Sequence, residues 1–168
     1  MSSGGRSSLS EPPVVDASPL IHFSRTGTID LLKSLGPTIV VPASVYDEVR
    51  AKASDDSARV IEETSWLRRV PKSPIPADIV RWGLGAGESA VLDWARSHPG
   101  CIAILDDGRG RKLAQDLGLP LIGTLGIVLR AKSRGLIPHA RPVVERMIAN
   151  GMYLSPSVVQ KSLALVGE

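Results

Sequence analysis

Two adjacent aspartates, Asp106 and Asp107, directly follow the short apolar run at residues 101–105. Another acid, Asp16, follows an apolar pair at residues 14–15 in the same way. An apolar run of this kind predicts a strand buried on both faces, and open α/β sheets bind ligands at the carboxyl ends of their strands. We therefore expect these acids to share one pocket at a sheet edge.

Two glutamates are predicted to join this pocket. Glu48 lies in the early turns of the helix expected after the second strand, and Glu88 lies near the start of the helix that leads into the fourth. Clustered carboxylates repel one another in a low dielectric, and a hard divalent cation relieves that repulsion. Oxygen ligands without a neighbouring His or Cys indicate Mg²⁺ or Mn²⁺ rather than zinc. Such an ion activates water and neutralises phosphate charge.

Each acid also has a structural alternative. Glu48 and Glu88 could complement a helix dipole, and Asp16, Asp106 or Asp107 could cap the helix that follows it. We favour a shared site because four separate segments would otherwise place an acid at the same edge by accident.

The pattern of strands alternating with helices predicts an α/β fold. We expect a three-layer α/β/α domain with a central parallel five-stranded sheet and Rossmann-like topology. Ser18 and Ser44 are expected to act as helix N-caps. The expected strands are residues 14–16, 38–41, 66–70, 101–105 and 120–122, and the expected helices are 20–24, 29–35, 45–53, 55–64, 86–97, 108–117, 124–134, 141–150 and 157–166.

Length and composition indicate a soluble protein of one domain. We expect residues 1–12, rich in Ser and Gly, to be a disordered tail, and residues 13–168 to be a single domain with a C-terminal helical extension. No apolar run approaches the roughly 20 residues that a membrane span needs. The single cysteine, Cys101, excludes an internal disulfide and suits a reducing, cytoplasmic setting. We interpret it as a core residue.

Basic residues are unevenly placed along the chain. The net charge is only +3, but residues 109–146 hold eight Lys or Arg against two acids. This region is either a phosphate-backbone footprint or a set of solubilising helix faces. Arg109, Arg111 and Lys112 lie just beyond the acidic pocket, where they can hold flanking phosphates. His22, His98 and His139 form no triad-like arrangement, and we interpret them as surface or packing residues.

Four segments resemble the successive motifs of PIN domains. They are residues 14–21, 41–49, 84–90 and 104–111, while 123–126, 131–132 and 135–137 resemble a bacterial and archaeal branch of predicted nucleic-acid-binding PIN proteins. The resemblance covers residues 13–168. It implies a Mg²⁺- or Mn²⁺-dependent endoribonuclease related to the VapC toxins of toxin–antitoxin pairs, with RNA as substrate, an antitoxin as partner and a homodimeric, cytoplasmic form.

The resemblance also implies roles for single residues. The two final helices and Glu88, where compact toxins more commonly have Asp, depart from the family pattern. The implied catalytic acids are Asp16, Glu48, Glu88 and Asp107, the implied metal ligands are Asp16, Glu88, Asp106 and Asp107, and the implied substrate contacts are Ser18, Arg109, Arg111, Lys112 and Thr124.

Two alternatives remain at this point. One is a PIN scaffold that binds nucleic acid without cleaving it. The other is a receiver-like signalling domain, which needs a phospho-acceptor Asp at the end of a middle strand. The strand expected at residues 38–41 ends at Pro42 instead, which disfavours the receiver.

Overall fold

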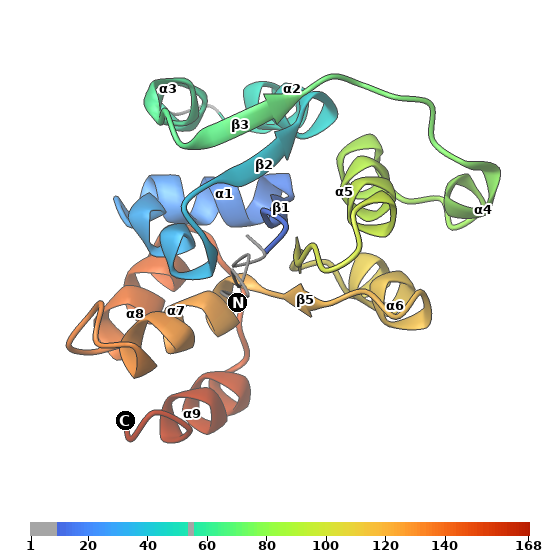
Figure 1. Cartoon of the computed structure of the whole chain (residues 1–168). Coiled ribbons are helices and arrows are strands. Elements are labelled where there is room, and N and C mark those ends of the chain that lie inside the picture. Colours follow the sequence, from blue (N-terminus) through green and yellow to red (C-terminus); the bar gives the residue numbers. More distant parts are fainter. Residues whose placement is uncertain (1–9, 54–55) are drawn as a thin grey trace, which may run out of the picture.

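A central sheet of five parallel strands organises the molecule (Figure 1). The computed structural model describes residues 10–53 and 56–168. The strand order is β3-β2-β1-β4-β5, which confirms the predicted three-layer α/β/α class. The strands are β1 (Val14–Val15), β2 (Ile39–Pro42), β3 (Leu67–Val70), β4 (Ala103–Ile104) and β5 (Leu121–Ile122).

Helices cover both faces of this sheet. In Figure 1, α5 and α6 lie on one side of the strands, and α1, α7 and α8 lie on the other. The helices are α1 (Ala17–Arg25), the 3₁₀ helix η1 (Ile29–Leu35), α2 (Ala43–Lys52), α3 (Ser57–Glu63), α4 (Ala77–Val80), α5 (Ala86–Ser97), α6 (Gly108–Asp116), α7 (Thr124–Ser133), α8 (Arg141–Ala149) and α9 (Pro156–Ala164).

The chain reverses its direction of travel across the sheet between β1 and β4. From β1 it moves outward through β2 to β3, and then it returns to the other side of β1 to form β4 and β5. Val15 of β1 pairs with Ile104 of β4. The backbone amide of Asp16 donates to the Ile104 carbonyl at 3.1 Å, so the first acid continues the ladder. A topological switch point of this kind is where open α/β sheets bind ligands.

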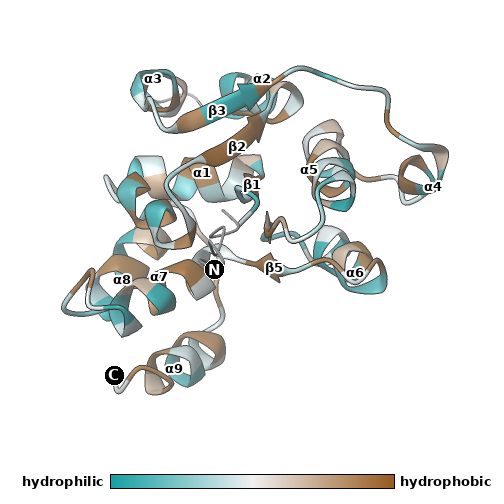
Figure 2. Ribbon diagram, viewed as in Figure 1, coloured by the Kyte–Doolittle hydropathy of each residue, from teal (hydrophilic) through white to brown (hydrophobic). Residues whose placement is uncertain are grey.

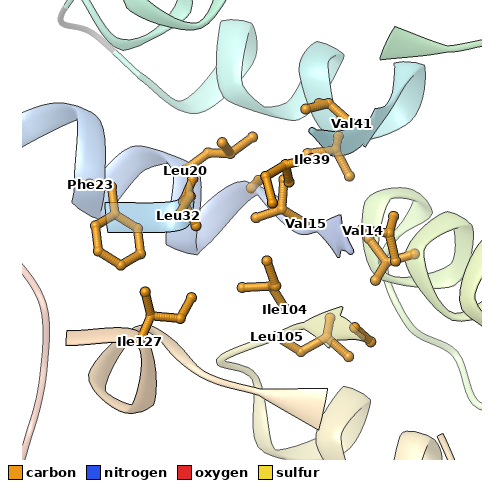
Figure 3. Close-up of a cluster of buried hydrophobic side chains, with 14 of the residues drawn as sticks. Val14, Val15, Leu20, Phe23, Leu32, Ile39, Val41, Ile104, Leu105 and Ile127 are labelled. Carbon is orange, nitrogen blue, oxygen red and sulfur yellow. The ribbon is translucent and has the colours of Figure 1, made fainter. Parts of the chain in front are cut away.

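The core is almost entirely aliphatic, since aromatics are only 4% of the sequence. Figure 2 shows β2 as apolar, while the middle of the edge strand β3 is hydrophilic because its two arginines are exposed. In Figure 3, Val15, Leu20, Ile104 and Ile127 converge between the sheet and its helices, and all four are fully buried. Cys101 is also fully buried, as predicted for a core residue.

Several predicted element boundaries are wrong by a few residues. Helix α1 begins at Ala17, directly after Asp16, so Ser18 is not its N-cap. Helix α2 begins at Ala43 after Pro42, which leaves Ser44 inside the helix. In both cases the strand runs straight into the helix, because the last extended residue occupies the N-cap position itself.

Two further elements differ from expectation. Residues 29–35 form a 3₁₀ helix rather than an α-helix. The single turn α4 was not predicted, because four residues are too few to show helical periodicity. The predicted start of a helix at residue 55 lies outside the described residues.

The last two helices extend the domain on the side of α1 and α7. Met147 of α8 and Leu163 of α9 are buried. The Glu168 carboxylate accepts a hydrogen bond from the Ala140 amide at 2.6 Å, which ties the end of the described chain to the start of α8. None of the described helices is long and apolar enough to cross a membrane.

Candidate active site

Asp16 is the most unusual acid of the sheet edge. Its side chain is 5% exposed at the junction of β1 and α1. Burial raises its pKa to about 7, a hydrogen bond from the Ala17 amide opposes the rise, and the negative charges of Glu88 and Glu48 add to it. Its Oδ1 is buried and has no hydrogen-bond partner among the described residues. A buried polar atom left unpaired is costly and marks a candidate functional group.

Glu48 reaches the same place from α2. Its Oε1 accepts a hydrogen bond from the Gly87 amide at 2.9 Å, and its Oε2 lies 3.4 Å from the Lys52 Nζ. A Cβ atom at Gly87 would lie 2.7 Å from the Glu48 Oε1 and 3.2 Å from the Asp16 Oδ1. The missing side chain at the first turn of α5 therefore lets both carboxylates approach the helix start.

Glu88 and Asp107 complete the group. Burial raises the pKa of the half-buried Glu88, and the charges of Asp107 and Glu48 raise it further. A Cβ atom at Gly110 would lie 3.3 Å from the Glu88 Oε2, so α6 also approaches closely through a glycine. Asp107 is exposed and caps α6, where its Oδ2 accepts from the amides of Arg109 at 3.0 Å and Gly110 at 3.1 Å.

The four acids fit a hard divalent cation in their chemistry. All are carboxylates, and a cation would offset the burial and mutual repulsion that raise the pKa of Asp16 and Glu88. Within residues 10–53 and 56–168, however, no three His, Cys, Asp or Glu side chains are arranged to hold one metal ion. Glu48 and Asp107 each have one oxygen bonded to backbone amides. Because the described side chains do not already enclose an ion, some of them would have to move to bind one.

Asp106 stands apart from the other acids, although it precedes Asp107. Its Oδ1 accepts from the Thr124 amide at 2.8 Å, and its Oδ2 accepts from the Thr124 hydroxyl at 2.6 Å. Thr124 is fully buried. The structure thus pairs a predicted metal ligand with a predicted substrate contact, and this pair anchors the start of α7 to the end of β4.

The predicted substrate-binding residues of α6 already have partners. The Arg109 guanidinium donates to the Trp82 carbonyl, and the Arg111 Nη1 donates to the Leu105 carbonyl at 2.9 Å. Lys112 forms an exposed ion pair with Asp116. Each guanidinium keeps further N–H groups that can reach a phosphate. Ser18 is exposed on the first turn of α1.

Most of the remaining basic segment ties elements together rather than forming an open basic surface. Arg130 and Arg134 both donate to the Ser34 carbonyl, which joins α7 to η1. Arg146 donates to the Thr26 carbonyl, which joins α8 to the end of α1. The position of a basic residue in the chain does not by itself separate these structural cations from a phosphate footprint.

Two features of the site were missed from the sequence. Gly87 and Gly110 allow helices α5 and α6 to approach the acids closely. In the sequence they are marked only by their positions, Gly87 directly before Glu88 and Gly110 three residues after Asp107. Lys52 lies one helical turn after Glu48, a spacing that predicts an ion pair.

Comparisons with known proteins bear on this geometry. A protein-family model that is described as a PIN domain matches residues 12–168 of the sequence. No curated protein matched the sequence.

Proposed function

The chain belongs to the PIN-domain family, whose fold is a nuclease fold, and we propose that it is a Mg²⁺- or Mn²⁺-dependent endoribonuclease. One observation carries the proposal. The buried Oδ1 of Asp16, which has no hydrogen-bond partner among the described residues, lies within the fields of Glu48 and Glu88, and Asp107 in turn acts on Glu88. A site that gathers several carboxylates at a switch point is suited to a cation.

In this proposal Asp16, Glu88 and Asp107 would hold the cation. A bound divalent ion lowers the pKa of a water ligand and neutralises charge on the phosphate. Glu48, fixed by the Gly87 amide, accepts the proton of the attacking water. The water oxygen then bonds to phosphorus, one ester P–O bond breaks, and the leaving oxygen takes up a proton from solvent water.

The RNA backbone is proposed to lie over the start of α6. Arg109 is oriented there by the Trp82 carbonyl, which leaves its other N–H groups for the phosphates that flank the cleaved bond. Lys112 adds charge from the exposed side of the helix, and Ser18 adds a hydroxyl from α1. The Asp106–Thr124 pair positions α7 and does not hold the ion.

Cleavage of a fluorescent single-stranded RNA tests the proposal. We expect Mn²⁺-dependent cleavage that EDTA abolishes, and a loss of about a hundredfold or more in Glu88→Gln. Glu145→Gln removes an exposed acid on α8 and serves as the matched control. Cleavage that survives EDTA or Glu88→Gln contradicts the proposal. Binding of RNA without cleavage by the folded protein would favour the non-catalytic scaffold.

The biological setting is proposed from the resemblance alone. A toxin role implies a cytoplasmic protein that forms a homodimer and binds an antitoxin. Size-exclusion chromatography with light scattering measures the molar mass in solution and so tests the homodimer directly. A monomer at micromolar concentration would contradict it.

A further inference from the structure

A cavity of about 540 Å³ is bordered by Asp106, the residue directly before Asp107. Its polar end is formed by Asp106 and Arg111, with His22 of α1 nearby. Its apolar walls come from β5, α7, α9 and the segment before α9, and include Leu125 and Val158. The cavity adjoins the active site through the chain itself, because Asp106 and Asp107 are consecutive.

The polar end presents an acceptor beside a donor. Both Asp106 oxygens accept from Thr124, but each carboxylate oxygen has a second lone pair. Arg111 is held in place by its bond to the Leu105 carbonyl and keeps its other N–H groups. A Cβ atom at Gly123 would lie 2.9 Å from the Arg111 Nη1 and 3.1 Å from the Asp106 Oδ1. The glycine therefore leaves both groups uncovered.

A flat, polar-edged ring is the ligand that this arrangement suits. The apolar walls can cover the two faces of the ring, while the carboxylate and the guanidinium meet its edge. Guanine matches best because it offers two donors, N1–H and the N2 amino group, for a carboxylate and two acceptors, O6 and N7, for a guanidinium. Adenine offers one donor group beside N7, and the pyrimidines are smaller.

Single-stranded RNA supplies such a ring. Proteins recognise it by splaying bases out and binding their edges in pockets, with aromatic side chains stacking on their faces. Tyr153, 90% exposed, also borders this cavity and provides a stacking surface. We propose that the cavity between Asp106, Arg111 and the walls of α7 and α9 binds a guanine base of the RNA, next to the bond that is cut. This inference rests on the proposed nuclease function.

Binding of the four nucleoside 5′-monophosphates, measured by calorimetry in EDTA, tests the base site without requiring cleavage. We expect guanosine monophosphate to bind roughly tenfold more tightly than the other three. Val158→Trp fills the cavity from α9 and should remove this preference, and Ser162→Trp is a second filling variant from the same helix. Leu136→Trp, at an exposed apolar position that does not line the cavity, is the matched control and should bind as the wild type does.

Cleavage of a randomised RNA pool, with sequencing of the cut ends, then separates the two proposals. We expect guanine to be enriched beside the cut, and Val158→Trp to lose this enrichment while it still cleaves. Cleavage without base preference, together with equal binding of the four monophosphates, overturns the guanine site and leaves the nuclease intact. Selective guanosine monophosphate binding that Val158→Trp removes, in a protein that cuts no RNA, supports the base site and rejects the nuclease.

Discussion

Asp16 and Asp106 end neighbouring strands of the same sheet, yet their surroundings are opposite. Asp106 has both oxygens hydrogen-bonded to the buried Thr124. Asp16 is buried whereas Asp106 is half-buried, yet the Asp16 Oδ1 has no partner among the described residues, and burial raises the pKa of Asp16 to about 7. The comparison teaches that the bonding of an acid at a strand end depends on which helix start supplies donors to it.

The difference also explains why one edge can serve two purposes. Asp106 joins the end of β4 to the start of α7, while the Asp16 Oδ1 has no hydrogen-bond partner among the described residues and, under the proposed function, would be available to a cation. Functional sites commonly carry a cost in stability. The predictions below ask whether the two aspartates differ in this way.

The largest expected difference is in catalysis. Asp16→Asn removes the charge of the buried carboxylate and should lower the rate of RNA cleavage by about a hundredfold or more. Asp106→Asn should keep the rate within roughly tenfold of the wild type, since it weakens a positioning contact. Initial rates at saturating Mn²⁺ measure both. Equal losses in the two variants would show that both acids belong to the catalytic group.

The two variants should change stability in opposite directions. In EDTA at pH 8, Asp16→Asn should raise the free energy of unfolding, on the order of 2–4 kcal/mol, because it removes a buried charge with a strongly raised pKa. Asp106→Asn should lower it by about 1 kcal/mol, because one acceptor facing Thr124 becomes a donor. Urea denaturation measures both values. A destabilised Asp16→Asn protein would contradict the account of a strained carboxylate.

The pH dependence of stability follows from the same carboxylate. The pKa of Asp16 is about 7 in the folded protein against 3.8 for the ordinary group, so folding favours its protonated form. Its favourable contribution is full below pH 3.8 and is lost as the pH rises through 7. The raised pKa of Glu88 acts in the same direction. The difference in free energy of unfolding between wild type and Asp16→Asn should therefore widen from about pH 4 to about pH 7. A constant difference across this range would contradict the assignment.

The close approach at Gly87 should give a smaller effect. Gly87→Ala places a Cβ atom against the Glu48 Oε1 and the Asp16 Oδ1, so it should destabilise the protein by about 1–3 kcal/mol and weaken Mn²⁺ binding. Gly108→Ala is the matched control, because a Cβ atom there meets no described atom within 4 Å and this glycine also lies in the first turn of a helix. Thermal denaturation of both variants provides the comparison. Equal behaviour of the two would show that the space at Gly87 is not needed.

Much of the architecture was predictable because strands and helices differ in their periodicity. The buried strands were predicted from their apolar runs, and α5 was predicted with the same bounds, Ala86–Ser97, that the structure has. The acids could be placed at one edge because parallel strands share an orientation. The hydrogen-bond partners of Asp106 and Asp107 could not be predicted separately. They depend on which of the two following helices, α6 or α7, supplies amide donors to each carboxylate.

Other features depend on contacts between distant segments and leave little trace in the sequence. Arg130 and Arg146 were counted with the basic footprint, but their partners are carbonyls far away in the chain. The cavity beside Asp106 depends on α9 and the segment before it, which follow β4 by some 50 residues. Spacing rules describe neighbours within an element and do not reach this far.

Mn²⁺ binding, measured by calorimetry on the wild type, Asp16→Asn and Asp106→Asn, tests the central claim most directly. The account predicts that the wild type and Asp106→Asn bind the ion with similar affinity and that Asp16→Asn loses it. Unchanged binding in Asp16→Asn, or no binding by the folded wild type, would contradict the account.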